Sequence, residues 1–470
     1  MRKRLKGMAA MVAVVGLLGS ACSEGNNDSG APATDPSSTE ESDTETTGAS
    51  EAPTTEAPVV ELAVLSSSID TGLAYTGGPG GVASGEPIKI GYVNQEGGVP
   101  SFPDTSVGAD SGVWFVNNFL GGVGGRPIEL VKCFVVDETD SQKCAQEMLA
   151  NDEVQAVLVG AMASANLPLL ETLKDKKPVF IPNPLTPEEF FATDAYAFTP
   201  GGPGVIQGMA VFTAKYLPEY ENREVKKVAV LYSENAAGVV AFEVLTKPIL
   251  EKFGIEITAV PLPDTAGPTE MASAIQSSGA DTADVLYPIV TVQGCIGIYD
   301  ALATLEITIP VVTTGLCSGV PMQDHVKAKG APGSLPDGWY FGDYGYAYEI
   351  PGNPDNDTYI DAALAWARET GVENPEYTGF GRPTFGSLLT LVKFMNDGAL
   401  DASALRAAAK AFTGPMWAGV GEFKCGGNAA FPSLCGFSIG IQQQQGDTLV
   451  SIMDGYNGKS LNPIAELAAG

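Results

Sequence analysis

The chain has 470 residues, and its 56 Asp and Glu outnumber its 26 Lys and Arg, which gives a formal net charge of −30 at pH 7. An acidic excess of this size disfavours nucleic acids and anionic membrane surfaces as partners. The length exceeds one ordinary domain and suits two lobes that each have a core of their own.

The N-terminus has the features of an export signal. Basic residues occupy four of the first six positions, the apolar run Met8–Leu18 follows, and small residues lead to Cys22. This pattern predicts a signal peptide over residues 1–21 and not a membrane span. It also resembles bacterial lipoproteins, which implies a lipid on Cys22 and a protein anchored at the extracytoplasmic face of the cell membrane. Gly19 stands where lipoproteins usually have Leu, so ordinary cleavage after Ala21 is the alternative.

Residues 22–86 predict a disordered tether rich in Ser, Thr, Glu, Pro and Gly. Ten acidic residues lie between Glu24 and Glu61, and no Lys or Arg occurs there. Such a segment is solvated and repels itself.

From Ile88 onward, short apolar strands alternate with helices. The first half predicts strands at 88–93, 128–136, 156–159 and 178–181, with helices at 105–119, 141–151, 167–175 and 205–216. Short strands that alternate with helices imply a parallel sheet covered on both faces.

The pattern restarts near residue 226 and changes after Gly338. In the second half we predict strands at 226–232, 255–260, 283–288 and 309–313 and helices at 236–253, 269–278 and 293–305. In the remainder we predict helices at 357–369, 385–396 and 403–411 and strands at 421–424, 437–441 and 448–453. We expect an α/β protein with two doubly wound, Rossmann-like lobes joined by a multi-strand hinge. Lobe 1 would comprise residues 87–220 and about 348–415, and lobe 2 residues 221–347 and about 416–460. Ligand would bind at the carboxyl ends of the strands.

Seven cysteines are present, and export makes disulfides their natural state. With Cys22 set aside, six remain in three local pairs, and this spacing favours Cys133–Cys144, Cys295–Cys317 and Cys425–Cys435 among the fifteen possible pairings. The rival interpretation is metal ligation, but the chain has no C-x-x-C motif and one histidine. We therefore predict no metal site and no cofactor.

From Ile88 the chain resembles type I periplasmic binding proteins, in the branch that binds branched-chain amino acids for ABC importers. Four segments carry the resemblance: the helix end and turn at 119–131, the segment 137–145, the stretch 157–187 that includes Ile181-Pro-Asn-Pro-Leu-Thr-Pro187, and the strand 228–232 with Gly238. The resemblance implies a monomer that captures a small amino-acid-like, carboxylate or amide ligand between its lobes. It also implies delivery of this ligand to an ABC permease in the cytoplasmic membrane. A tethered protein that reports ligand to a sensor is an alternative, because lobe closure would serve both roles.

The resemblance implies ligand contacts in loops that follow strands. The expected residues are Phe102, Ser164, Asn183, Thr186, Asn235, Thr291 and Thr314. Ser164 would supply the principal hydroxyl for the ligand carboxylate, beside a helix N-terminus that favours anions. The alternative for Ser164 is that it only caps that helix, and the alternative for Phe102 is local loop packing.

Two departures from the family pattern concern the ligand. Leu185 takes the position of a second hydroxyl, and Gly315 stands where an acid should pair with a ligand ammonium. Because an unpaired buried ammonium is costly, either Glu234, Asp343 or Glu96 serves instead or the ligand is not an α-amino acid.

An enzyme is the remaining alternative. Gly315-Leu-Cys-Ser-Gly319 mimics a nucleophile elbow with cysteine, but only His325 could act as its base, and a disulfide at Cys317 would remove the thiol. We therefore expect no catalytic residue. Arg382 could contact a carboxylate or form an ordinary ion pair, and Tyr344 lies near an expected crossing between the lobes.

Overall fold

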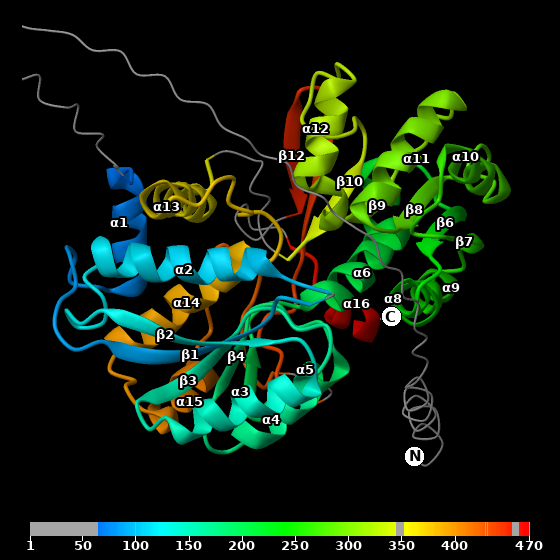
Figure 1. Ribbon diagram of the computed structural model, residues 1–470. Coiled ribbons are helices and arrows are strands. Elements are labelled where there is room, and N and C mark those ends of the chain that lie inside the picture. The colour runs from blue at the N-terminus through cyan, green and yellow to red at the C-terminus, as the bar shows by residue number, and fades with distance from the viewer. Residues whose placement is uncertain are drawn as a thin grey trace, which may run out of the picture. The chain divides into compact units, whose positions relative to one another are not determined.

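The computed structural model describes residues 64–470 except 99, 345–351, 428, 430, 454–459 and 470. The predicted signal peptide, the lipidation site Cys22 and most of the predicted tether lie outside the described residues. The described part forms the α/β fold with two lobes that the sequence predicts (Figure 1).

Lobe 1 is built on a five-stranded parallel sheet of order β2-β1-β3-β4-β5. Its strands are β1 (Ile88–Gln95), β2 (Ile128–Val135), β3 (Val154–Val159), β4 (Val179–Ile181) and β5 (Ala195–Ala197). Its helices are α1 (Ser66–Thr76), α2 (Pro103–Asn118), α3 (Glu138–Ala150), α4 (Asn166–Leu173), α5 (Pro187–Phe191), α13 (Pro354–Thr370), α14 (Gly381–Asn396) and α15 (Ala402–Ala411).

Side-chain alternation along β1 explains why lobe 1 has a core on each face of its sheet. Ile90 and Tyr92 point into the core formed with α2, α13 and α14, and Val93 points into the core formed with α3 and α4. Because both faces are covered, these parallel strands are apolar on both sides.

Lobe 2 contains the three-stranded parallel sheet β7-β6-β8 and the four-stranded sheet β12-β11-β10-β9. A bridge between Leu286 and Val311 connects the two sheets. The strands are β6 (Lys227–Ser233), β7 (Glu256–Leu262), β8 (Val285–Ile289), β9 (Val312–Thr314), β10 (Tyr340–Asp343), β11 (Gly440–Gln445) and β12 (Thr448–Met453). The helices are α6 (Gly201–Val211), η1 (Phe212–Tyr216), α7 (Leu217–Tyr220), α8 (Ala236–Val240), η2 (Ala241–Thr246), α9 (Lys247–Lys252), α10 (Pro268–Ser277), α11 (Val292–Thr304), η3 (Gly315–Ser318), α12 (Val320–Ala328) and α16 (Pro463–Ala469).

The chain crosses between the lobes three times. The first connection joins β5 to α6 through residues 198–200, the second leads from β10 to α13, and the third returns from Cys435 to β11. A hinge of several segments limits the ways in which the lobes can move relative to one another.

Two segments pack with a different core from the one that the sequence analysis expected. Residues 205–217 contribute to the core of lobe 2 and not lobe 1, since Val205, Met209 and Phe212 pack with β6 and β8. Residues 416–435 contribute to the core of lobe 1 and not lobe 2. The predicted strand at 421–424 is reduced to an isolated bridge between Phe423 and Gly436.

The end of the predicted tether is a folded part of lobe 1, contrary to expectation. Helix α1 packs on α13 and α14, with Ile69, Leu73 and Tyr75 against the core. The Tyr75 hydroxyl lies 2.7 Å from Thr390 Oγ1 and accepts a hydrogen bond from the backbone N–H of Trp417 at 3.1 Å. Residues 64–86 therefore belong to the domain.

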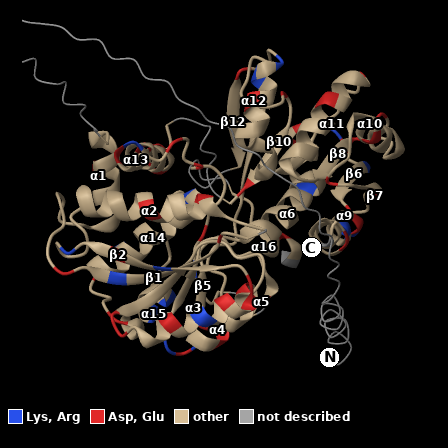
Figure 2. Cartoon of the chain, viewed as in Figure 1, with Lys and Arg blue, Asp and Glu red and all other residues tan. Residues whose placement is uncertain are grey.

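The structure joins all three cysteine pairs that the spacing favours: Cys133–Cys144, Cys295–Cys317 and Cys425–Cys435. Charged side chains lie mostly on helices and loops, while the strands carry few (Figure 2). Among the described residues, every helix falls short of the length and apolar character that crossing a bilayer requires.

Candidate functional site

The carboxyl ends of the parallel strands gather most of the expected ligand residues. In lobe 1 the strand order reverses between β1 and β3, and in lobe 2 it reverses between β6 and β8. Such reversal points leave a crevice at the carboxyl ends of the strands, where ligands bind in doubly wound folds. Ser164 follows β3, Asn235 follows β6, and Thr291 follows β8.

Ser164 has a hydroxyl that is oriented by the protein and accessible to solvent. Its Oγ accepts a hydrogen bond from Nε2 of Gln95 at 3.0 Å, and Oε1 of the same amide accepts the N–H of Ala163 at 2.8 Å. Gln95 is buried and Ser164 is exposed. Because the oxygen already accepts from Gln95, the hydroxyl proton can be donated to a carboxylate or carbonyl oxygen.

Ser164 does not cap the following helix. The N-cap of α4 is Ala165, and no side chain accepts a capping hydrogen bond there. Ala165 has φ of +61°, a left-handed conformation that is uncommon for a residue with a Cβ. The capping alternative for Ser164 is therefore wrong, and its ligand role stays a prediction.

Asn183 and Thr186 are occupied by the protein itself. The Asn183 amide nitrogen donates to Gly160 O, Phe380 O and Thr384 Oγ1, and its oxygen accepts from the Tyr344 hydroxyl at 3.3 Å. Thr186 is the N-cap of α5 and forms a capping box with Glu189. Their buried side chains therefore organise the loop after β4 instead of offering donors to a ligand.

Phe102 ends the loop between β1 and α2 and is half-buried. Its ring contacts Phe380 edge-on, with centroids 5.6 Å apart. This is the loop packing foreseen as the alternative, and the remaining exposed part of the ring can still serve as a wall.

The lobe 2 residues are helix N-caps. Asn235 caps α8 and also donates to Asp264 at 2.7 Å, so its amide is largely occupied. Thr291 caps α11 through its oxygen, which leaves its hydroxyl proton available, and Thr314 precedes η3 without a side-chain capping bond. The two threonines therefore remain the better candidate donors.

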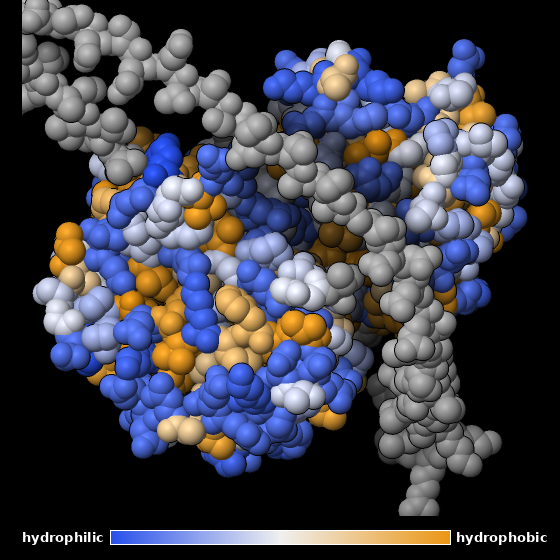
Figure 3. Space-filling model, in the orientation of Figure 1, coloured by the Kyte–Doolittle hydropathy of each residue, from blue (hydrophilic) through white to orange (hydrophobic). Residues whose placement is uncertain are grey.

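Exposed apolar residues lie close in sequence to Ser164 and Thr314. Leu167, in the first turn of α4, is 55% exposed, and Leu316, in η3, is 60% exposed. Apolar residues also interrupt the hydrophilic surface on the face shown in Figure 3. A site with hydroxyl donors and apolar neighbours suits an amphipathic ligand with a polar end.

Gly315 lies beside one of the three acids proposed as substitutes. A Cβ on Gly315 would lie 3.6 Å from Cγ of Asp343. However, Asp343 Oδ2 accepts from Arg382 at 2.9 Å, so its charge is matched. Glu96 accepts from Asn94 and Ser106, at 3.0 Å and 2.6 Å.

Glu234 differs from the other two acids because it is exposed. Among the described residues neither Glu234 nor Glu96 forms an ion pair, whereas Asp343 pairs with Arg382. It follows β6 directly and precedes Asn235. Of the three, it is the acid most readily available to a ligand ammonium.

Two buried acids near the lobe 1 loops have perturbed pKa values. Burial raises the pKa of Asp104 to about 6, although the Phe380 N–H donates to it at 2.5 Å and opposes the shift. Burial raises the pKa of Glu189 to about 8, against the opposing hydrogen bonds from Leu185 N and Thr186 N. Neither acid was identified as functional from the sequence, because nothing in the local pattern shows their burial.

The enzyme alternative loses its nucleophile. Cys317 is joined to Cys295, so no thiol is present in the Gly315–Gly319 turn. His325 pairs with Asp300 at 2.9 Å. Within the part of the chain that the structure describes, no group of three or more His, Cys, Asp or Glu could hold a metal ion.

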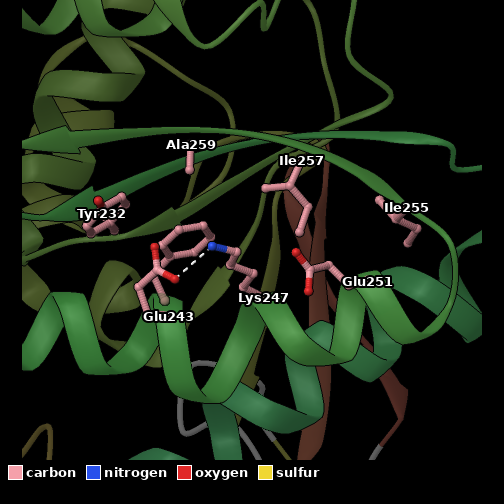
Figure 4. Close-up of a pocket in the computed structure, with 8 residues that line it drawn as sticks. Tyr232, Glu243, Lys247, Glu251, Ile255, Ile257 and Ala259 are labelled. Carbon is pink, nitrogen blue, oxygen red and sulfur yellow. Dashed lines mark hydrogen bonds and ion pairs between the residues drawn. The ribbon is translucent and has the colours of Figure 1, made fainter.

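A separate groove of about 260 Å³ lies on lobe 2 and contains none of the expected ligand residues (Figure 4). Its helix side carries Glu243, Lys247 and Glu251, and its strand side includes Ile257 and Ala259. Lys247 pairs with Glu243 at 2.8 Å, which is an ordinary surface ion pair.

Gln95 is the residue that sequence reasoning missed at the site. It is the last residue of β1 and follows Asn94, and both polar side chains are buried. Two buried amides at the end of a strand were the available signal, because such groups need partners and often organise neighbouring loops.

These features define a two-lobed α/β protein in which the expected ligand residues lie at the carboxyl ends of parallel strands. Residues 87–432 match the model of the family described as periplasmic binding protein, so the chain belongs to that family. No curated protein matches the chain.

Solved structures share the fold at low sequence identity. A putative branched-chain amino acid ABC transporter protein from Rhodospirillum rubrum is 14% identical, with 78% of this chain and 100% of that chain covered and a TM-score of 0.59. An ABC transporter substrate-binding protein from Desulfitobacterium hafniense, in complex with Leu, is 16% identical, with 78% and 100% covered and a TM-score of 0.55. A solute-binding protein from R. palustris, in complex with 4-hydroxybenzoate, is 17% identical, with 80% and 95% covered and a TM-score of 0.57.

Proposed function

We propose that the protein is an extracytoplasmic, lipid-anchored solute-binding protein that captures a small molecule between its lobes and delivers it to an ABC permease. The ligand is amino-acid-like or carries a carboxylate or amide. The observation that carries this proposal is the Ser164 hydroxyl, held by the buried Gln95 amide at the point where the strand order of lobe 1 reverses. The family and the ligands named for the similar structures support the same class of function.

A thermal-shift screen of the mature chain tests the proposal. The screen should contain matched pairs such as leucine and 4-methylpentanoate, which differ in the α-ammonium, together with amides, aromatic acids and sugars. Ligand at a hundred times its dissociation constant stabilises the protein by about 2.7 kcal/mol. A screen in which no compound raises the melting temperature would contradict solute binding.

Ser164→Ala tests the site. Loss of a hydrogen bond to a charged ligand costs about 1.5–3 kcal/mol, so the dissociation constant should rise about 10- to 150-fold. Ser277→Ala is the matched control, because Ser277 is exposed on α10 and not at the carboxyl end of a strand. Equal affinities of the Ser164→Ala variant and the unchanged protein would exclude Ser164 as a ligand residue.

The anchor has a separate test. Mass spectrometry of the membrane fraction should find diacylglycerol on Cys22, whereas a free N-terminus at Cys22 would show cleavage without lipidation.

A further inference from the structure

Two polar contacts join the lobes at the second connection. Arg382, in the first turn of α14 in lobe 1, donates to Asp343 at the end of β10 in lobe 2, at 2.9 Å. The next residue, Tyr344, donates its hydroxyl proton to Asn183 in lobe 1. The helix and the strand belong to different cores, because Phe385 of α14 packs in lobe 1 and Tyr340 of β10 in lobe 2.

The ion pair is shielded from water. The Arg382 side chain is 2% exposed and the Asp343 side chain 20% exposed. Exposed ion pairs contribute little to stability, but removal of one partner of a buried pair is strongly unfavourable. Arg382 also lies at the N-terminus of α14, where the helix dipole is positive and further stabilises the nearby carboxylate of Asp343. An arrangement of the lobes that separates Arg382 from Asp343 is therefore disfavoured.

The second contact, the hydrogen bond from Tyr344 to Asn183, is fixed by further hydrogen bonds of Asn183. Three acceptors in lobe 1 fix the amide nitrogen of Asn183, so its oxygen is directed at Tyr344. The same loop after β4 also contacts the first connection. Thr199 Oγ1 donates to Pro182 O at 2.6 Å, and a Cβ on Gly201 would lie only 2.1 Å from Pro184 O. The loop thus contacts two of the three segments that join the lobes.

We infer that the Asp343–Arg382 ion pair and the Tyr344–Asn183 hydrogen bond form a latch that holds the lobes in the described arrangement. The four residues are positioning residues, since they set how the two halves of the ligand site face each other without being ligand donors. The effect on ligand affinity rests on the proposed function, whereas the effect on the lobe arrangement does not. A protein that populates a binding-competent arrangement less often binds its ligand more weakly by the same factor.

The latch is tested by electron–electron distance measurements between spin labels on the two lobes. Labels attached through azide-bearing residues at Glu171 on α4 and Lys327 on α12 would leave the disulfides intact, and both positions are exposed. Asp343→Asn is expected to shift or broaden the distance distribution without ligand, and Tyr344→Phe to do so to a smaller extent. Asp300→Asn is the matched control, because Asp300 pairs with His325 and Lys329 within lobe 2.

A distribution for Asp343→Asn that overlays that of the unchanged protein would overturn the latch. If Asp343→Asn does not fold, Arg382→Lys and Tyr344→Phe decide, and unchanged distributions for both would overturn it as well. With a compound identified by the thermal-shift screen, Asp343→Asn should change the dissociation constant by about tenfold or more and Asp300→Asn by less than about twofold. Failure of the screen would contradict solute binding and leave the distance test of the latch in force.

Discussion

The ionisation of Glu189 should make the stability of the protein depend on pH in an unusual direction. Glu189 is fully buried, and its Oε2 accepts from the N–H groups of Leu185 and Thr186 at 2.7 Å and 2.9 Å. Its Oε1 is buried and has no hydrogen-bond partner among the described residues. The Thr186 hydroxyl donates a third hydrogen bond to Oε2 at 3.3 Å. Desolvation of the charged form outweighs these three hydrogen bonds and raises the pKa of Glu189 from 4.5 to about 8.

The magnitude follows from the difference between the folded and unfolded pKa values. One pH unit corresponds to about 1.4 kcal/mol, so a rise from 4.5 to about 8 corresponds to about 5 kcal/mol. Between these values the folded protein keeps a proton that the unfolded chain has lost, so stability falls as pH rises. The stabilisation is fully present below pH 4.5 and is lost as pH rises through about 8.

Glu189→Gln removes this titration while keeping an oxygen for the loop N–H groups. Denaturant unfolding of both proteins at a series of pH values is the assay. The stability of the variant relative to the unchanged protein should rise by about 4 kcal/mol between pH 4.5 and pH 8.5, whatever constant cost the buried amide adds. Glu188→Gln is the control, because Glu188 is the exposed neighbour on α5.

A pH-independent difference between the Glu189→Gln variant and the unchanged protein would refute this reasoning. It would mean that the two backbone donors stabilise the carboxylate enough to keep it charged throughout.

Three further predictions concern the same fold. Tyr75→Phe should lower the free energy of unfolding by about 1–3 kcal/mol in denaturant titrations, because the buried N–H of Trp417 loses its acceptor. An unchanged free energy of unfolding would mean that α1 contributes to stability through apolar contacts alone. Asp104→Asn should flatten the loss of stability as pH rises from about 4 to about 6, a contribution of about 3 kcal/mol, and melting curves at these pH values that match those of the unchanged protein would contradict the raised pKa. Replacement of Cys133 and Cys144 by Ala should reduce stability by about 3 kcal/mol in the same titrations, and a smaller loss would indicate that the reduced chain keeps local structure.

Helices and strands that are defined by a local pattern of apolar residues could be predicted from the sequence. β1 was predicted over 88–93 and runs to Gln95, and α13 was predicted over 357–369 and spans Pro354–Thr370. Period-two and helical apolar patterns define such elements, and their ends are fixed by partners elsewhere in the chain. Asn94 and Gln95 at the end of β1 show this dependence. Their side-chain oxygens accept hydrogen bonds from the N–H groups of Ala161 and Ala163, which follow β3 and lie 67 and 68 residues away in the sequence.

Helix α1 shows why the boundary of the tether was misjudged. Its sequence, Ser66–Thr76, is rich in Ser, Thr and Gly and resembles the segment before it. What stabilises it lies more than 300 residues away, since Tyr75 contacts Thr390 and Thr76 O accepts from Asn396. A composition typical of linkers therefore forms a helix when a distant surface supplies its partners.

The predicted ligand residues of lobe 1 differ in their exposure and hydrogen bonding, which also depend on distant parts of the chain. Ser164, Asn183 and Thr186 are all short polar residues in loops after strands, and the sequence predicts all three as ligand residues, with Ser164 as the principal hydroxyl. In the structure Asn183 and Thr186 are buried and their polar atoms are used within the protein, while the Ser164 hydroxyl is exposed and oriented by Gln95. A polar side chain can bind a ligand only through donors or acceptors that are not already used in hydrogen bonds within the protein.

The same reasoning applies to charge and narrows the ligand. Asp343 lies where a side chain on Gly315 would point, but Arg382 neutralises it from lobe 1. An ammonium placed there would compete with a buried guanidinium for one carboxylate, which is unfavourable for both cations. Under the proposed function, recognition of an α-ammonium would then depend on Glu96, which accepts hydrogen bonds from Asn94 and Ser106, or on the exposed Glu234, whose interactions are weakened by water and salt. Under the proposed function, we therefore expect ligands recognised by hydrogen bonds to a carboxylate or amide more than ligands that depend on an ion pair with an ammonium.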